Sequence, residues 1–234
     1  MEQLQHFFQD KTVNTLLDVG TGTGNFIAVL KETFVNLQIT GIDPDETSLN
    51  EAALKYPDVE FKKMSGGKLD FPDSSFDGAS ISMALHHLPD VQQTLMEMRR
   101  VVKPGGWIIV NELFSDNLNP AQEVQKLMHH FRSKIDRLTG VCHNETFTRS
   151  EILDLIENSG LKICAAFNNN KAPQVVATND LAKRFSELKD MLEQIKDKPE
   201  YHQLDNHLSE IEKLLTLHGF QMATRVVVVA IVHK

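Results

Sequence analysis

The chain has 234 residues, of which 41% are hydrophobic and 24% charged, and its formal net charge at pH 7 is −8. A chain of this length and composition can bury its own core, so it needs neither disulfides nor a structural metal. The acidic balance argues against broad binding to nucleic acid or to an anionic membrane, because both need a positively charged surface. We therefore expect a single domain, 1–234, with no nucleic-acid or membrane partner.

The cysteines and the apolar runs bear on the cellular compartment. Cys142 and Cys164 are the two cysteines, and they form neither a disulfide framework nor a CxxC metal motif. The first residues lack a basic segment followed by an apolar run, so we expect no secretory signal. The longest apolar run, 226–232, is too short to span a bilayer. These features predict a cytoplasmic protein.

The first half of the chain alternates short apolar segments with helical patterns. The expected strands are 16–19, 37–42, 59–61, 76–84 and 107–110, and the expected helices are 24–34, 47–55 and 90–100. Residues 103–106, Lys-Pro-Gly-Gly, predict a tight turn before the last of these strands. Strands that alternate with helices of this length build a parallel sheet with helices on both faces.

The pattern changes after Phe114. A helix is expected at 120–138, where the apolar residues fall on one face. A second helix is expected at 148–160, because Thr148 and Glu151 match a capping box at its start.

Two strands, 161–167 and 224–232, enclose a pair of amphipathic helices. Apolar residues recur at helical spacing from Leu181 to Ile195 and again from Leu204 to Leu215. The pair predicts a helical hairpin. It is either a packed embellishment or a functional element, namely a lid over a ligand pocket or a dimer face.

A glycine-rich loop between the first strand and the first helix is the strongest local signal. Residues 18–24 read Asp-Val-Gly-Thr-Gly-Thr-Gly. The glycines allow positive φ and a close approach to a ligand, and the following helix supplies free N–H groups. Asp43 lies 19 residues after Gly24, at the end of the second strand. A carboxylate there can accept hydrogen bonds from both ribose hydroxyls, so the combination predicts a nucleoside-type cofactor.

The residues around the glycines distinguish between cofactors. A dinucleotide fingerprint would have its third glycine at position 25, which is Asn25, and it does not call for an acid at Asp18. A Walker A loop is excluded because no Gly-Lys-Ser/Thr follows. An acid before the loop disfavours a pyrophosphate and suits an ammonium group, which S-adenosylmethionine carries on its amino-acid tail. The loop therefore favours S-adenosylmethionine over a nicotinamide dinucleotide.

Four segments, in this order, resemble the small-molecule branch of the class I S-adenosylmethionine-dependent methyltransferases. They are residues 18–26, 41–45, 71–90 and 100–106. The resemblance implies a doubly wound, Rossmann-like α/β sheet of seven strands, mostly parallel with an antiparallel last strand. Outside these segments, the chain's own helical patterns predict cap insertions at about 116–146 and 171–222. The cofactor-binding residues that the resemblance implies are Asp18, Gly20, Thr21, Gly22, Gly24, Asp43, Pro44, Ser65 and Met83.

The chain departs from the family pattern after the third strand. Members often carry Gly-Asp-Ala there, and the Asp holds the adenine amino group, whereas this chain has Ser65. A serine hydroxyl is a weaker acceptor than a carboxylate. The departure leaves two readings open: a methyltransferase enzyme of the EC 2.1.1 type, and a non-catalytic S-adenosylmethionine-binding or regulatory protein.

The expected reaction needs few catalytic groups. In-line transfer to a small-molecule acceptor mainly requires holding the acceptor atom about 3–3.5 Å from the methyl group. His86 and His87 are weak candidates for a general base, and a structural role at a helix start is equally open. We expect no metal site, because adjacent histidines such as His129 and His130 point apart on a helix.

The acceptor pocket is expected to come from the insertions, because only about 13 residues precede the first strand. We expect residues 116–146 to line it, with Phe131 or His143 facing the acceptor. The hairpin is expected to pack against this segment or against a second subunit in a homodimer.

Overall fold

The computed structural model describes residues 1–169 and 178–233. The chain folds into two compact units. The first comprises Met1–Glu112, Ser150–Asn169 and the strand that starts at Arg225, and the second comprises Leu113–Arg149 and, among the described residues, 178–224. The start of the expected second insertion, 171–177, lies outside the described residues.

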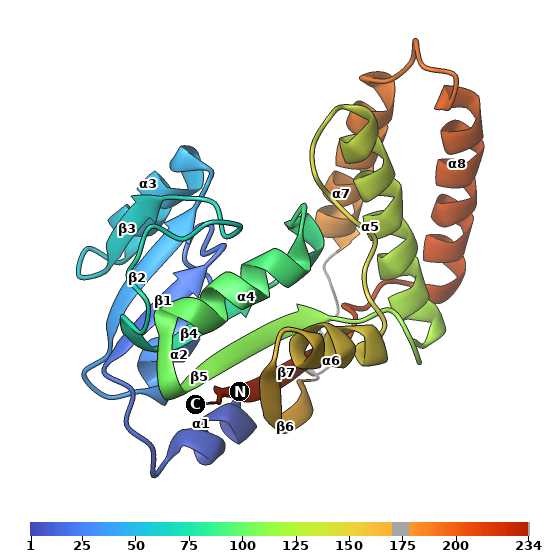
Figure 1. Ribbon diagram of the computed structural model, residues 1–234. Helices are drawn as coiled ribbons and strands as arrows, with labels where there is room; N and C mark the ends of the chain where they lie inside the picture. The colour runs from blue at the N-terminus through green and yellow to red at the C-terminus, as the bar shows by residue number, and fades with distance from the viewer. Residues whose placement is uncertain (170–177, 234) are drawn as a thin grey trace. The chain divides into compact units, whose positions relative to one another are not determined.

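The first unit is built on a seven-stranded sheet (Figure 1). Its strands are β1 (Thr15–Val19), β2 (Gln38–Asp43), β3 (Glu60–Lys63), β4 (Phe76–Ser82), β5 (Val102–Leu113), β6 (Leu161–Asn169) and β7 (Arg225–Val232). They lie in the order β3-β2-β1-β4-β5-β7-β6. The pairs β1–β2, β1–β4, β2–β3 and β4–β5 are parallel, and the last strand runs antiparallel to β6. This topology confirms the predicted doubly wound sheet.

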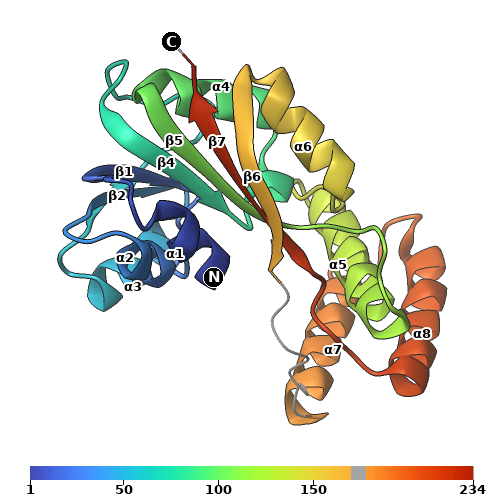
Figure 2. The ribbon, with the colours of Figure 1, turned by 90° about the horizontal axis from the view of Figure 1, so that it is seen from below.

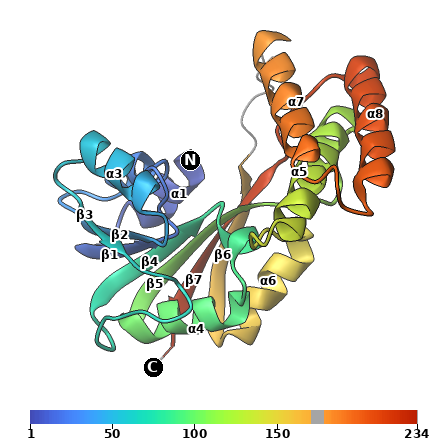
Figure 3. The ribbon, with the colours of Figure 1, turned by 90° about the horizontal axis from the view of Figure 1, so that it is seen from above.

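Helices cover both faces of this sheet. They are α1 (Glu2–Phe8), α2 (Ile27–Thr33), α3 (Glu46–Lys55), α4 (Val91–Val101) and α6 (Arg149–Asn158), with a 3₁₀ turn, η1, at Leu85–His87. Figures 2 and 3 show α1, α2 and α3 on one face and α4 and α6 on the other. The helix starts follow local capping chemistry. Asp45 and Asp90, for example, accept hydrogen bonds from the first backbone N–H groups of α3 and α4.

The sequence patterns missed α1, although its apolar residues belong to the core. Leu4 and Phe8, one turn apart, are buried with apolar residues of α2, β1, β2 and β7. The Phe8 ring meets the Trp107 ring edge-on, with 5.5 Å between centroids. A seven-residue helix gives little periodic signal, because isolated helices of this length are marginal and tertiary packing stabilises them.

Three expected boundaries were wrong. The helix after the glycine loop begins at Ile27 rather than at position 24, because Gly24 has a φ of +76°. Strand β4 ends at Ser82, since Met83 takes a φ of +56°. Strand β5 already begins at Val102, which pairs with Phe76, so residues 103–106 are part of a long irregular strand rather than a turn before it.

The second unit is helical. It contains α5 (Pro120–Leu138), α7 (Thr178–Glu193) and α8 (Tyr201–His218), and the bounds of α5 are those expected from the sequence. A capping box between Asn119 and Gln122 fixes the start of α5. The apolar stripes of the three helices share one core, whose buried residues are Val124, Met128, Phe131, Ile135, Phe185, Leu188, Leu192, Ile195, Leu204, Leu208 and Ile211.

This core bears on two expectations, the acceptor contact of Phe131 and the packing of the helical hairpin. Phe131 is 1% exposed and packs inside the second unit, so it does not face an acceptor as the sequence suggested. The hairpin uses its apolar faces to pack against α5. In the described part of the chain, every helix is either too short or too polar to cross a membrane.

Candidate functional site

The glycine loop connects β1 to α2 at the carboxyl end of the parallel strands. Gly20, Gly22 and Gly24 all have positive φ, between +51° and +76°. A methyl group at position 20 would lie 2.7 Å from the Cβ of Ala84, so only glycine fits there. At Gly22, by contrast, a Cβ would meet nothing within 4 Å. The loop therefore presents open space beside its central glycine, where a ligand can approach the backbone.

Backbone hydrogen bonds hold the loop against the end of β2. The Thr21 N–H donates to the carbonyl of Ile42 at 2.9 Å. The Gly22 N–H donates to Oδ2 of Asp43 at 2.9 Å, and the Asp45 N–H donates to Oδ1 of the same carboxylate at 2.9 Å. The expected ribose acceptor, Asp43, is therefore fixed in place by the loop that it faces. Each carboxylate oxygen can accept more than one hydrogen bond, so capacity for ribose hydroxyls remains.

Asp18 is the most unusual group of the site. Its side chain is 1% exposed, and its Oδ1 accepts a 2.6 Å hydrogen bond from the Ser80 hydroxyl. Its Oδ2 is buried and has no hydrogen-bond partner among the described residues. Burial raises the pKa of this carboxyl from 3.8 to about 6, even though the bond from Ser80 acts in the opposite direction. A buried acid with one unsatisfied oxygen suits a cationic group.

The remaining predicted cofactor residues lie at strand ends of the same sheet. Pro44 and Ser65 are exposed, just after β2 and β3. The Ser65 hydroxyl lies 3.5 Å from the Gly67 N–H, a long contact for a hydrogen bond. Met83 follows β4, and its N–H donates to the carbonyl of Asn111 at 2.8 Å. The first unit thus brings all the predicted positions to the carboxyl ends of β1, β2, β3 and β4.

The two candidate histidines, His86 and His87, differ in their exposure to solvent. Both lie in η1, directly after β4, but His86 is 3% exposed whereas His87 is exposed. Nδ1 of His86 lies 3.1 Å from Oε1 of Glu112, and the other oxygen of Glu112 accepts the Leu85 N–H at 2.9 Å. Glu112 therefore fixes both the turn and the orientation of the His86 ring.

Glu112 is a residue that the sequence reasoning missed. It is 1% exposed, near the carboxyl end of β5, in the apolar run that begins at Trp107. Burial lowers the pKa of the Arg225 guanidinium, and the charge of Glu112 opposes that shift. An acid inside a buried strand is the signal that could have identified it, because charged residues are rarely fully buried without a partner.

These residues fit S-adenosylmethionine. Asp18 can hold the ammonium of its amino-acid tail, and Asp43 can accept from the ribose hydroxyls. The space beside Gly22 lets the cofactor approach the loop backbone. The positive φ of the loop glycines keeps the loop backbone free of side chains at this strand end, so polar ligand atoms can reach it.

Comparison with known sequences points the same way. Residues 17–110 match the family described as "Methyltransferase domain". A demethylmenaquinone methyltransferase of Chlorobaculum parvum is 29% identical over 144 residues, which are 61% of this chain and 58% of that protein. The O-methyltransferase rstn1 of Aspergillus nomiae is 32% identical over 157 residues, 62% of this chain and 69% of that protein. The chain thus spans less than three fifths of the Chlorobaculum enzyme that it matches.

Solved structures share the fold at lower identity. The YcgJ protein of Bacillus subtilis superposes with a TM-score of 0.63 at 16% identity, and each chain is covered fully. Phosphoethanolamine N-methyltransferase 2 of Haemonchus contortus, solved with S-adenosyl-L-methionine, gives a TM-score of 0.59 at 17% identity over 99% of this chain and 51% of that one. The matched domain, the sequence relatives and the shared fold agree. The chain belongs to the class I S-adenosylmethionine-dependent methyltransferases, and its cofactor is S-adenosylmethionine.

Proposed function

We propose that this chain transfers the methyl group of S-adenosylmethionine to a small-molecule acceptor by in-line displacement. The observation that carries the proposal is the buried Oδ2 of Asp18, which has no partner among the described residues. Leaving an anionic oxygen unsatisfied is unfavourable, and the ammonium of the cofactor would satisfy it. The sequence relatives, which are named as methyltransferases, support the same reaction.

We assign the cofactor contacts to the positions expected from the sequence. Asp18 would bind the ammonium, Asp43 the ribose hydroxyls, and the backbone of the glycine loop the remaining polar atoms of the tail. Pro44 and Met83 would pack against the nucleoside, and the Ser65 hydroxyl would face the adenine. Thr21 completes the set through its backbone, which holds the loop on β2.

The chemistry asks little of the protein once the cofactor is bound, since the sulfonium already activates the methyl group. The residues of the chain orient the acceptor and exclude water. For an acceptor that keeps its proton at neutral pH, we propose His86 as the base, because Glu112 fixes its ring. His87 is exposed, so it is the weaker choice.

The acceptor is proposed to be small and partly apolar. The relatives support this class, since they are named as demethylmenaquinone methyltransferases and as an O-methyltransferase. Three earlier expectations stay predictions: residues 116–146 contribute to acceptor binding, the hairpin forms a homodimer, and the protein is cytoplasmic. The two exposed, free cysteines support a reducing compartment.

Two measurements test the proposal. Isothermal titration with S-adenosylmethionine, S-adenosylhomocysteine and NAD should show binding of the first two only. Screening phenols, hydroquinones and small amines with a radiolabelled methyl donor should then identify an acceptor. Binding of NAD alone would overturn the cofactor assignment, and cofactor binding without transfer to any acceptor class would favour the non-catalytic reading.

A further inference from the structure

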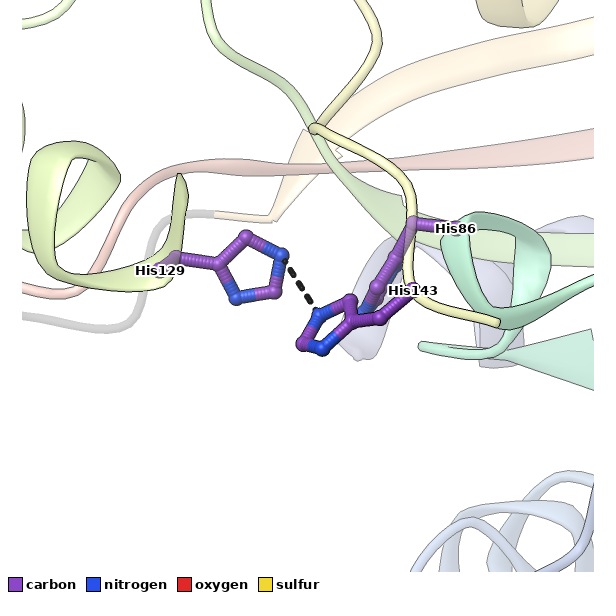
Figure 4. A group of neighbouring side chains, drawn as sticks. All are labelled: His86, His129 and His143. Carbon is purple, nitrogen blue, oxygen red and sulfur yellow. Dashed lines mark hydrogen bonds between the residues drawn. The ribbon is translucent and has the colours of Figure 1, made fainter. Parts of the chain in front are cut away.

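Three side chains of the second unit form a connected series. Oδ2 of Asp136 lies 2.6 Å from Nδ1 of His143, and Nε2 of His143 lies 3.3 Å from Nε2 of His129. Figure 4 shows the two imidazoles turned toward each other, with the contact dashed. The series thus ends on two ring nitrogens, the Nε2 atoms of His143 and His129, that face one another.

The helix and the segment after it build this arrangement. His129 and Asp136 are seven residues apart on α5, which is about two helical turns, so both lie on one face. His143 comes from the segment that follows α5. The Val141 N–H donates to the Asp136 carbonyl at 2.8 Å, and the Arg137 guanidinium donates to the His143 carbonyl at 2.8 Å. These bonds fold the segment back, so that His143 is placed against the face of α5.

The distance between the ring nitrogens is the one that a shared metal requires. Two nitrogens bound at about 2.0–2.1 Å to one zinc ion, at the tetrahedral angle, are about 3.3–3.4 Å apart. The Nε2 atoms of His129 and His143 are 3.3 Å apart. We propose that these two histidines bind a divalent zinc-type ion through their Nε2 atoms, with further ligands from water or from other donor groups.

Asp136 acts on this site as a positioning residue. Histidines that bind metals usually give their other ring N–H to a carboxylate, which fixes the tautomer and the ring orientation. The 2.6 Å contact of Asp136 with Nδ1 of His143 has this form, and it directs the lone pair of His143 onto Nε2. His143 is 3% exposed and Asp136 is mostly buried, so the orientation is held firmly.

A cavity of about 120 Å³ reaches His129. His129 lines it together with Gln125, Met128 and Arg132 of α5, and with residues of α7. Oε1 of Gln125 is buried and has no hydrogen-bond partner among the described residues. Gln125 lies one turn before His129, on the same face of α5. A water on the metal could therefore donate to Gln125 and would relieve its unsatisfied oxygen.

The site differs from the histidine pairs that the sequence brought to notice. Adjacent histidines do point apart: the Nε2 of His130 lies 2.8 Å from the Thr146 hydroxyl, not beside His129. A chelating pair forms instead between α5 and the following segment, 14 residues apart in sequence. Two imidazoles favour zinc, copper or nickel, whereas magnesium and calcium prefer oxygen ligands.

Metal titration of the whole, chelator-treated protein tests the proposal. We expect one equivalent of Zn²⁺ to bind by isothermal titration and one equivalent of Co²⁺ to give the intense visible absorption of a tetrahedral site. His129→Gln and His143→Gln should each weaken binding at least tenfold. Asp136→Asn should weaken it about 10- to 100-fold, the usual effect of losing such a carboxylate. The matched control is His202→Gln, an exposed histidine of α8 that should bind as the wild type does.

The outcome that overturns the proposal is equally definite. If Zn²⁺ binding is absent, or is the same in the wild type and in the His129→Gln variant, the pair is a hydrogen-bonded imidazole pair and no metal site. Circular dichroism shows whether each variant is folded. If the variant of the buried His143 does not fold, the variant of the partly exposed His129 still tests the proposal. Titrating S-adenosylmethionine on the same samples separates a failed metal site from a failed cofactor site.

Discussion

The substitution Asp18→Asn should change both the pH dependence of stability and the pH dependence of cofactor binding. The carboxyl group is buried between Ser80 and the glycine loop, and its folded-state pKa is about 6 against an ordinary value of 3.8. The asparagine keeps the size of the side chain but cannot ionise. Differences between the two proteins across the pH range therefore report on this one group.

The two pKa values of Asp18, folded and unfolded, determine the sign and the size of its contribution to the free energy of unfolding. Below pH 3.8 the group is protonated in both the folded and the unfolded protein. Between 3.8 and 6 only the folded protein keeps the proton, so its stability falls as the pH rises. The full penalty above pH 6 is about 3 kcal/mol, from a shift of about 2.2 pKa units. Between pH 5 and pH 7 the contribution of Asp18 changes by about 1.3 kcal/mol.

Urea unfolding at pH 5 and at pH 7 measures this contribution. The difference in unfolding free energy between wild type and Asp18→Asn should change by about 1.3 kcal/mol between the two pH values. Relative to the variant, the wild type should have a higher unfolding free energy at pH 5 than at pH 7, because the buried acid is mostly protonated at pH 5. Other titrating groups are common to both proteins, so they cancel in the difference.

Cofactor binding should show the opposite trend. The cofactor ammonium needs the ionised carboxylate, and at pH 5 most of the ligand-free protein carries the proton. The wild type should therefore bind S-adenosylmethionine about tenfold more weakly at pH 5 than at pH 7, whereas Asp18→Asn should bind weakly at both. Titration calorimetry in two buffers should also detect a proton released on binding near pH 6. If stability and cofactor affinity depend on pH in the same way in the two proteins, Asp18 has neither a raised pKa nor a contact with the cofactor ammonium.

Three further substitutions test the geometry of the loop. Gly20→Ala should destabilise the fold by about 1–3 kcal/mol, because its Cβ would lie 2.7 Å from that of Ala84 at a φ of +65°; urea unfolding measures this. Gly22→Val should abolish cofactor binding in a titration, because the side chain fills the open space beside the loop; the φ of +51° adds backbone strain of about 1–3 kcal/mol, which the rest of the fold should tolerate. Asp43→Ala should weaken cofactor binding by about 1.5–3 kcal/mol, the range for hydrogen bonds to a charged group.

Controls separate stability from binding in this series. Asp43→Asn keeps the size of the side chain but only one acceptor oxygen, which can serve the Gly22 or the Asp45 N–H group and not both. Its affinity for the cofactor should therefore lie between those of the wild type and Asp43→Ala, while both variants remain folded. Unchanged affinity in a folded Asp43→Ala protein would remove the ribose role. Wild-type affinity in Gly22→Val would mean that the cofactor lies elsewhere, and an undiminished stability of Gly20→Ala would show that the loop can move away from Ala84.

The order of the elements and most of the cofactor positions could be predicted from sequence, because their signals are local. Glycines that need positive φ, an acid at a strand end and apolar runs of strand length appear within a few residues of one another. The short α1 could not be found in this way, since it depends on the packing of Phe8 against Trp107. The boundaries at Gly24 and Met83 were missed because single φ values ended the elements there.

The sequence by itself determined the α/β fold, its resemblance to the class I S-adenosylmethionine-dependent methyltransferases and the position of the cofactor loop at residues 18–24. The tertiary structure alone decided which polar groups meet inside the fold. Ser80 binds Asp18 from a neighbouring strand, 62 residues away, and Glu112 fixes His86 from the next strand, 26 residues away. His143 reaches His129 because the segment after α5 folds back on the helix. Such pairs depend on strand register and loop path, which are set by burial across the whole fold and leave no periodic signal in the sequence.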